Sequence, residues 1–165
     1  MPKQININYY FLITNDINMK KKEIENYYNQ VLETIIERFK IPGTTYLTQL
    51  NDIGNTLFGR NYIGTFPADK EPKLHNRQMC IMNLDPTGLP GSHWIALAKD
   101  NDEILIYDSF GRPTKDIYKT TYKNQKYTAT EDDAEQDESE ENCGARCLAF
   151  LQVFKALGAS AAINI

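Results

Sequence analysis

The chain has 165 residues, 41% of them hydrophobic and 11% aromatic, which is enough for one packed core and too much for a disordered chain. Its 18 basic and 22 acidic residues give a net charge of −4, which argues against a generally basic nucleic-acid coat protein. No apolar run has the length of about 20 residues that a membrane span needs, and the first residues lack the pattern of a signal peptide. Three cysteines are too few for a secreted disulfide framework. We expect a soluble protein of a reducing compartment, with no membrane contact and no secretion.

Two helices are predicted near the N-terminus. Residues 19–40 carry apolar side chains at three- and four-residue steps, which is typical of an amphipathic helix. Thr44 or Thr45 is a candidate cap for a second, shorter helix. That helix would run through Leu47, Leu50 and Ile53. Turns are then expected at Gly54, Gly59 and Gly64.

A sheet and a last helix are predicted from residue 78 onward. Apolar runs predict strands at 78–84, 93–98 and 103–107, and a further strand at 126–130. The run at 103–107 is almost wholly apolar, which favours a central place in the sheet. Residues 113–122 are compatible with a short helix. A longer helix is predicted from Cys143 to Leu157, and Gly158 ends it.

Charge is concentrated in two neighbouring stretches. Residues 131–141, the acidic loop, hold eight of the 22 acidic residues, and the rest of the chain then has 18 basic and 14 acidic residues, a net of +4. A basic stretch at 112–126 comes just before it. Two interpretations stay open: a weak, salt-sensitive association of the basic stretch with DNA, or pairing of the two stretches with each other.

Cys143 is the candidate nucleophile. It begins a predicted helix, where unpaired backbone N–H groups and the helix dipole favour a thiolate. The alternative for a free cysteine is a small buried residue, and Cys147 fits that description better. A metal site is not expected, because a C-x-x-x-C pair and a distant His75 supply too few ligands.

A thiolate nucleophile needs a base, and the chain has two histidines. His75 lies in a polar stretch and is expected at the surface, whereas His93 opens a predicted strand beside Trp94, the sole tryptophan. Asp108 ends the next strand, and a hairpin brings the start of one strand beside the end of the other. We therefore expect Asp108 to orient the His93 imidazole. The alternative for Asp108 is a simple turn residue.

Acyl transfer also needs donors for an oxyanion. The Cys143 backbone N–H at the helix start is one candidate. Gln136 is an amide within the acidic loop and is the second candidate, with an ordinary polar loop residue as the alternative.

The ordered set His93-Trp94, Asp108, Gln136 and Cys143-Gly144 resembles the adenovirus-type and ubiquitin-like-modifier cysteine endopeptidases. The seven-residue step from Gln136 to Cys143 is more similar to the adenovirus branch. Further similar segments are Tyr62-Ile63-Gly64-Thr65-Phe66-Pro67, Gly91-Ser92-His93-Trp94 and Asp108-Ser109-Phe110-Gly111, the last two in the forms found in protease genes of virophages, polinton-like elements and large DNA viruses. The resemblance covers about residues 60–157.

This resemblance implies an α+β, papain-like fold in circularly rearranged order, with the nucleophile helix packed on a mixed sheet. It implies one peptidase domain over residues 1–165, with a helical extension at 1–43 and a core at 44–165. It also implies roles for the site residues: Cys143 as nucleophile, His93 as general base and then acid, Asp108 as orienter and Gln136 as oxyanion donor. Trp94 would pack beside His93, and Gly144 would support the site.

The function implied is that of a monomeric viral maturation protease, which cuts capsid or core precursor proteins after small, Gly-type residues. Its place would be the virion and the infected host cell, in cytoplasm or nucleus. No cofactor is required; the resemblance allows a peptide or DNA activator, which the acidic net charge disfavours. Two alternatives stay open: removal of ubiquitin or a ubiquitin-like modifier from host proteins, and a catalytically silent binding module.

Overall fold

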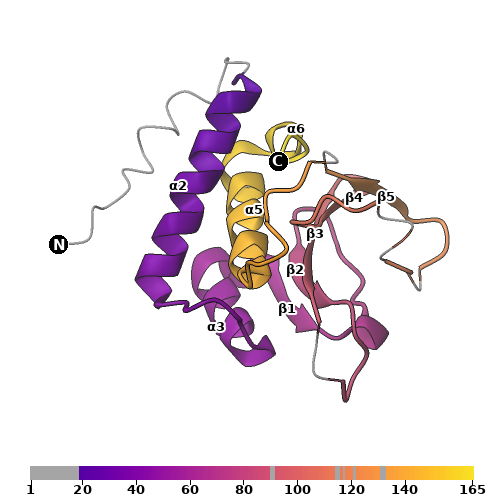
Figure 1. Ribbon diagram of the computed structural model, residues 1–165. Coiled ribbons are helices and arrows are strands. Elements are labelled where there is room, and N and C mark those ends of the chain that lie inside the picture. The colour runs from indigo at the N-terminus through magenta and orange to yellow at the C-terminus, as the bar shows by residue number, and fades with distance from the viewer. Residues whose placement is uncertain (1–18, 90–91, 114–115, 117, 121, 131–132) are drawn as a thin grey trace.

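The computed structural model describes residues 19–165 except 90–91, 114–115, 117, 121 and 131–132. The chain contains both helices and a mixed β-sheet, which confirms the predicted α+β class (Figure 1). The helices are α2 (Lys21–Phe39), α3 (Leu47–Phe58), α5 (Cys143–Leu157) and α6 (Ala159–Ala162), and the strands are β1 (Tyr62–Phe66), β2 (Met79–Asn83), β3 (Trp94–Asp100), β4 (Glu103–Tyr107) and β5 (Lys126–Ala129). Two short 3-10 turns, Gly59–Asn61 and Ala68–Lys70, complete the order.

The five strands form one mixed sheet in the order β1-β2-β3-β4-β5. The pairs β2/β3 and β3/β4 are antiparallel, while β1/β2 and β4/β5 are parallel. Strand β4 is interior, as its apolar sequence predicted, although β3 holds the middle of the sheet. The β3/β4 hairpin therefore places the start of β3 beside the end of β4.

Helix α5 lies between the sheet and helix α2 (Figure 1). Ten of its fifteen residues are buried, because both of its long sides are covered. Helix α2 contributes one apolar face to the same core, through Ile24, Tyr27, Tyr28, Val31, Leu32 and Ile35. Burial of each large apolar side chain stabilises a fold by about 1.5–3 kcal/mol. The N-terminal helix is thus an integral part of the layer that supports α5.

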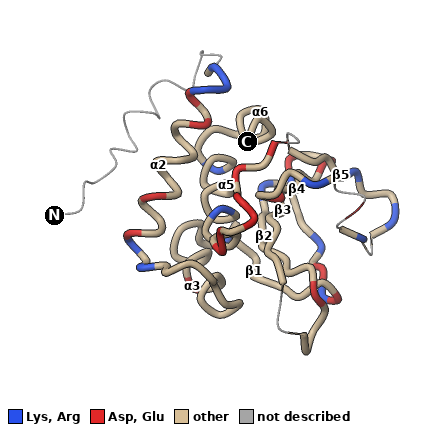
Figure 2. The backbone as a smooth tube through the Cα atoms, in the orientation of Figure 1, with Lys and Arg blue, Asp and Glu red and all other residues tan. Residues whose placement is uncertain are grey.

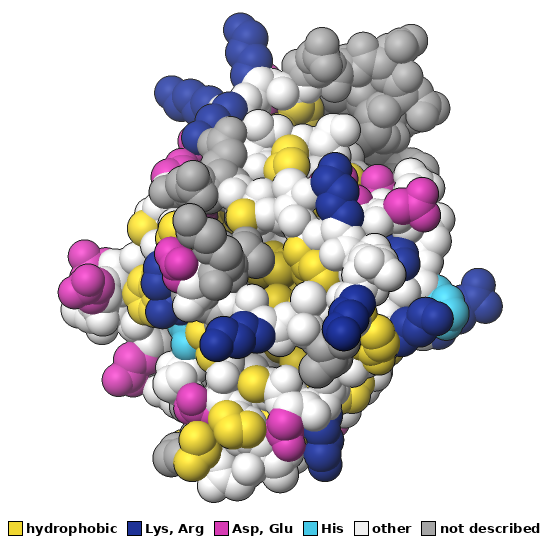
Figure 3. Space-filling view, turned by 90° about the vertical axis from the view of Figure 1, so that its right-hand side faces the viewer, with side chains coloured by type: hydrophobic (Ala, Val, Ile, Leu, Met, Phe, Trp, Pro, Cys, Tyr) yellow, Lys and Arg dark blue, Asp and Glu magenta, His cyan; other side chains and the backbone are white. Residues whose placement is uncertain are grey.

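The other face of the sheet carries a second, smaller apolar cluster. Its buried members are Leu74, Cys80, Met82, Ile95, Leu97, Ile104 and Ile106. Tyr118 and Tyr127 are partly buried against it. Seen from the right-hand side of Figure 1, the surface shows Lys and Arg side chains with apolar atoms between them (Figure 3). None of the helices in the described part of the chain combines the length and the hydropathy that a bilayer crossing requires.

The predicted caps of the second helix are wrong. Helix α3 starts after Tyr46, which makes no side-chain capping bond, and it continues to Phe58. Thr44 instead donates a hydrogen bond to Glu141, and Thr45 is buried without a hydrogen-bond partner for its hydroxyl. Both threonines face the segment that carries the nucleophile candidate, which explains why they are not used as caps.

The glycine-based turn predictions are correct at one position of three. Gly59 caps the C-terminus of α3 with φ of 58°, as expected. Gly54 instead lies inside α3, where a Cβ would collide with the Tyr62 ring. Gly64 lies within β1, a strand that the sequence did not predict. The expected helix at 113–122 falls partly on residues outside the described part of the chain.

Candidate active site

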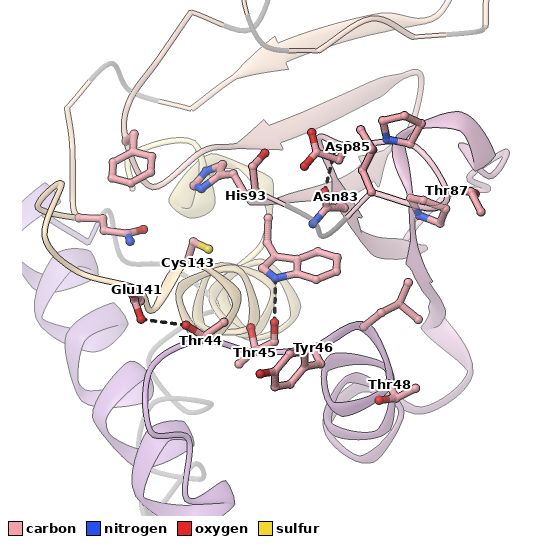
Figure 4. A pocket seen from close by; sticks show the side chains of 18 of the residues that line it. Thr44, Thr45, Tyr46, Thr48, Asn83, Asp85, Thr87, His93, Glu141 and Cys143 are labelled. Carbon is pink, nitrogen blue, oxygen red and sulfur yellow. Dashed lines mark hydrogen bonds between the residues drawn. The ribbon is translucent and has the colours of Figure 1, made fainter.

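Cys143 is the first residue of α5, with Asn142 as the preceding cap position. The helix starts where the chain leaves the acidic loop, and the thiol is half-buried. The close-up shows Cys143 directly below His93 in the same pocket (Figure 4). The position at a helix N-terminus is the one that the sequence predicted for a thiolate.

His93 and Asp108 meet at the end of the β3/β4 hairpin, as predicted. His93 immediately precedes β3, Asp108 immediately follows β4, and the ring Nε2 lies 2.6 Å from the Asp108 carboxylate. Both side chains are buried, at 6% and 3% exposure. Because Nε2 is held by the carboxylate, Nδ1 is the ring nitrogen left for the hydrogen bond with Cys143. Asp108 also accepts the backbone N–H of Phe110, so it serves the turn as well as the histidine.

Cys143, His93 and Asp108 shift one another's pKa values in directions that favour a thiolate and an imidazolium. Burial would lower the pKa of His93, but its hydrogen bonds with Asp108 and Cys143 outweigh burial and raise that pKa. Burial would raise the pKa of the Cys143 thiol, but the hydrogen bonds with His93 and the Trp94 backbone bring that pKa below its ordinary value. For Asp108, burial would raise the pKa, but hydrogen bonds from His93 and Arg112 outweigh burial and lower that pKa to about 2. A thiolate beside an imidazolium is the arrangement that these directions favour.

Gln136 lies in the same pocket as Cys143 and His93, and it is 4% exposed. Its carbonyl oxygen accepts the Ser109 hydroxyl at 2.6 Å, and its amide nitrogen donates to the Glu140 carbonyl at 2.6 Å. The two contacts fix which end of the amide is the NH2 group. One of its two hydrogens stays available for a ligand, which suits an oxyanion donor better than an ordinary polar loop residue.

Trp94 and Gly144 hold β3 and α5 close to the segment that precedes α3. The Trp94 indole N–H donates to the Thr45 carbonyl at 3.2 Å, which ties the start of β3 to the segment before α3. A Cβ on Gly144 would collide with the Thr45 hydroxyl and press on Leu50. Glycine therefore lets α5 approach that segment closely, directly after the nucleophile.

Three neighbours of Asp108 complete the site and were not predicted as functional. Ser109 holds the Gln136 amide, as described above. Phe110 stacks on the His93 ring, with centroids 4.8 Å apart. Arg112 donates to the second Asp108 oxygen at 2.8 Å. The sequence signal for Ser109 and Phe110 is the run Asp108-Ser109-Phe110-Gly111, in which only the aspartate was given a role, and Arg112 follows that run directly.

A buried hydrogen-bond network fixes the acidic loop to the helices. Arg146 of α5 donates to Glu140 at 3.1 Å, to Asn142 at 2.9 Å and to the Tyr28 hydroxyl at 3.4 Å. Tyr28 of α2 in turn bonds the hydroxyl of Tyr107 in β4 at 2.7 Å. Since the Glu140 carbonyl also accepts the Gln136 amide, α2 is connected to Gln136 through these contacts. The sequence showed the helix but gave no sign of this connection.

The pocket is a groove of about 770 Å³ that passes over Cys143. Its walls come from the segment 44–48, from residues 83–89 and from the acidic loop. Figure 4 shows Glu141 and Thr44 on one side of Cys143, and Asp85, Thr87 and Thr48 on the other. No residue of α2 lines the described groove, so this helix does not cover it.

The other sequence candidates lie away from this chemistry. Cys147 is fully buried, as predicted, and Cys80 is buried on the far face of the sheet. His75 is exposed, as predicted. Within the described residues, no group of three or more His, Cys, Asp or Glu side chains is placed to hold a metal ion.

The acidic loop forms its ion pairs with the helices. Asp133 pairs with Lys21 at 3.2 Å and Glu140 with Arg146 at 3.1 Å. No ion pair between described residues joins the loop to the basic stretch at 112–126. Figure 2 shows the acidic segment running beside α5.

No protein-family model matches this sequence, and no curated protein matches it. The site must therefore be interpreted from its geometry. The pocket offers candidates for a nucleophile, a base, an acceptor that orients the base and donors for an oxyanion, which together are the groups that acyl transfer needs.

Proposed function

We propose that this protein is a cysteine endopeptidase with a papain-like core in circularly rearranged order. The observation that carries the proposal is the buried 2.6 Å hydrogen bond between His93 and Asp108, which leaves the second ring nitrogen for Cys143 at the start of α5. If the His93–Asp108 pair had only a structural role, there would be no reason for a half-buried thiol beside the second ring nitrogen of His93. The packing of α5 on a mixed sheet agrees with such a core.

In the first half of the reaction, the Cys143 thiolate attacks the carbonyl carbon of the scissile peptide bond. The C–S bond forms as the carbonyl π electrons move to oxygen. The Cys143 backbone N–H and the free hydrogen of the Gln136 amide stabilise that oxyanion. The His93 imidazolium then gives its proton to the leaving amine as the C–N bond breaks, and a thioester remains.

In the second half, His93 is neutral and accepts a proton from water as the water oxygen attacks the thioester carbonyl. A second oxyanion forms at the same donors, and it collapses as the C–S bond breaks. The product carboxylic acid leaves, and the thiolate and imidazolium are restored. Asp108 keeps the ring oriented and stabilises its charged form throughout.

We further propose that the substrates are viral capsid or core precursor proteins, cut after small, Gly-type residues in the virion or infected cell. This part rests on the resemblance of the motifs around His93, Asp108, Gln136 and Cys143, and not on the groove. The groove has lining residues on both sides of the thiol, which suits a polypeptide that continues on both sides of the scissile bond.

The test is co-expression of the wild-type protein or its Cys143→Ala variant with candidate capsid precursors, followed by mass mapping of the product ends. We expect new ends after small residues with the wild type and none with the variant. Full cleavage by Cys143→Ala protein would overturn the peptidase proposal. Labelling of Cys143 by a ubiquitin-type activity probe without precursor cleavage would replace the maturation role with modifier removal.

A further inference from the structure

The groove exposes large apolar side chains. Tyr46, Leu47 and Leu89 are 71%, 40% and 58% exposed, and they are the large hydrophobic side chains that the described surface leaves exposed. All three line the groove. Apolar side chains gathered in a concave surface are typical of a site that binds an apolar group. Here they flank the thiol and are not dispersed over the molecule.

Most of the groove's carboxylates line its other side, and Asp85 is the one that Figure 4 shows on the side of Tyr46. Glu138, Glu140 and Glu141 line the groove beside Gln136, and no lysine or arginine of the described residues lines it anywhere. Glu140 is paired with Arg146. Glu141 accepts only a neutral hydroxyl, from Thr44, and Glu138 has no ion pair with any described residue.

None of the described ion pairs of Lys21, Arg112 and Lys126 involves these two carboxylates. Lys21 meets the loop at Asp133, which does not line the groove. Arg112 is held by Asp108, and Lys126 pairs with Glu103. Glu138 and Glu141 thus present their charge to whatever occupies the groove, next to the oxyanion donor.

We propose that the groove selects an extended peptide with a lysine or arginine opposite Glu138 and Glu141 and a large apolar side chain opposite Tyr46, Leu47 and Leu89. This inference rests on the proposed function and names its substrate class. Figure 4 shows Glu141 on one side of Cys143 and Tyr46 on the other, so we place the basic and the apolar residue on opposite sides of the scissile bond. An acidic residue in the basic position is rejected, because it would meet two carboxylates.

The test uses fluorescein-labelled peptides with a central Gly-Gly, a leucine on one side and either lysine or glutamate on the other, in both chain orders. Hydrolysis is followed with the wild-type protein, and binding is followed by anisotropy with Cys143→Ala protein. We expect the lysine peptide of one chain order to be preferred about 3- to 30-fold, as two exposed ion pairs allow. The preference should shrink as salt is raised.

The matched variants reverse two charges each. Glu138→Lys with Glu141→Lys should invert the preference toward the glutamate peptide. Glu33→Lys with Glu37→Lys, on the exposed face of α2, makes the same change in net charge and should leave the preference intact. Circular dichroism checks that both proteins are folded, and Glu138→Lys alone serves if the first double variant is not.

The two proposals fail in different ways. Hydrolysis of lysine and glutamate peptides at equal rates, or an equal effect of both double variants, would overturn the charge selection and leave the peptidase intact. Selective binding of the lysine peptide without hydrolysis of any peptide would support the groove inference and count against the peptidase.

Discussion

Asp108→Asn tests how the site activates its thiol. The substitution keeps the shape of a buried side chain that lies 2.6 Å from the His93 ring and removes its charge. Without the carboxylate, the imidazolium loses its stabilising partner, so its pKa falls and the thiolate of Cys143 becomes less favourable. The alkylation rate of Cys143 by iodoacetamide at pH 6 should fall accordingly.

The structure sets the size of this effect. The pKa of Asp108 is lowered from 3.8 to about 2, which corresponds to about 2 kcal/mol in favour of its charged form. His93 and Arg112 share that stabilisation. The share of His93 is therefore about 1–2 kcal/mol, which equals about a 5- to 30-fold lower alkylation rate.

The assay is a time course of alkylation at pH 6, with mass mapping of the labelled cysteine. Asp52→Asn is the matched control, because it removes an exposed carboxylate on α3 outside the groove. It should alkylate at the wild-type rate. A folded Asp108→Asn protein that also reacts at the wild-type rate would refute the idea that the carboxylate acts through His93.

Three further predictions concern the acidic loop. Gln136→Ala should lower kcat by about 100-fold or more through loss of an oxyanion donor, with little change in the alkylation rate of the thiol; equal losses in both assays would instead indicate a structural role. Arg146→Met should lower the free energy of unfolding in urea by about 1–3 kcal/mol, because it removes the hydrogen bonds of a buried guanidinium to Glu140, Asn142 and Tyr28, whereas Arg60→Met at an exposed site should change it little. Glu135→Gln should stabilise the fold by about 1–3 kcal/mol at pH 8: burial raises the Glu135 pKa to about 7, so the folded state disfavours the ionised form, and the gain should fade as pH falls toward 4.5.

The parts of the fold that sequence predicted are those with strong local patterns. The 3.6-residue periodicity of α2 and the apolar runs of β2, β3 and β4 each follow from burial of one element on its neighbours. Strand β1 was missed because Gly64 interrupts its apolar pattern. Gly54 was misread as a turn because its reason is tertiary: the Tyr62 ring packs against it, which no local pattern reveals.

The candidate site was predictable where residue type and strand order limit the choice. With two histidines and one aspartate at the end of the adjacent strand, hairpin geometry alone places His93 beside Asp108. The supporting contacts were not predictable, because Arg146, Tyr28 and Tyr107 come from three elements and meet only in the folded core. The sequence of no single element reveals that α5 lies between α2 and the sheet.

The central claim is that Cys143 is the nucleophile of a peptidase, and it is tested most directly with a proteome-derived peptide library. Wild-type, Cys143→Ala and Cys147→Ala proteins are incubated with the library, and new peptide ends are mapped by mass spectrometry. The account predicts new ends with the wild type and with folded Cys147→Ala protein, whose substituted thiol is fully buried, and none with Cys143→Ala. New ends produced equally by Cys143→Ala protein would contradict it.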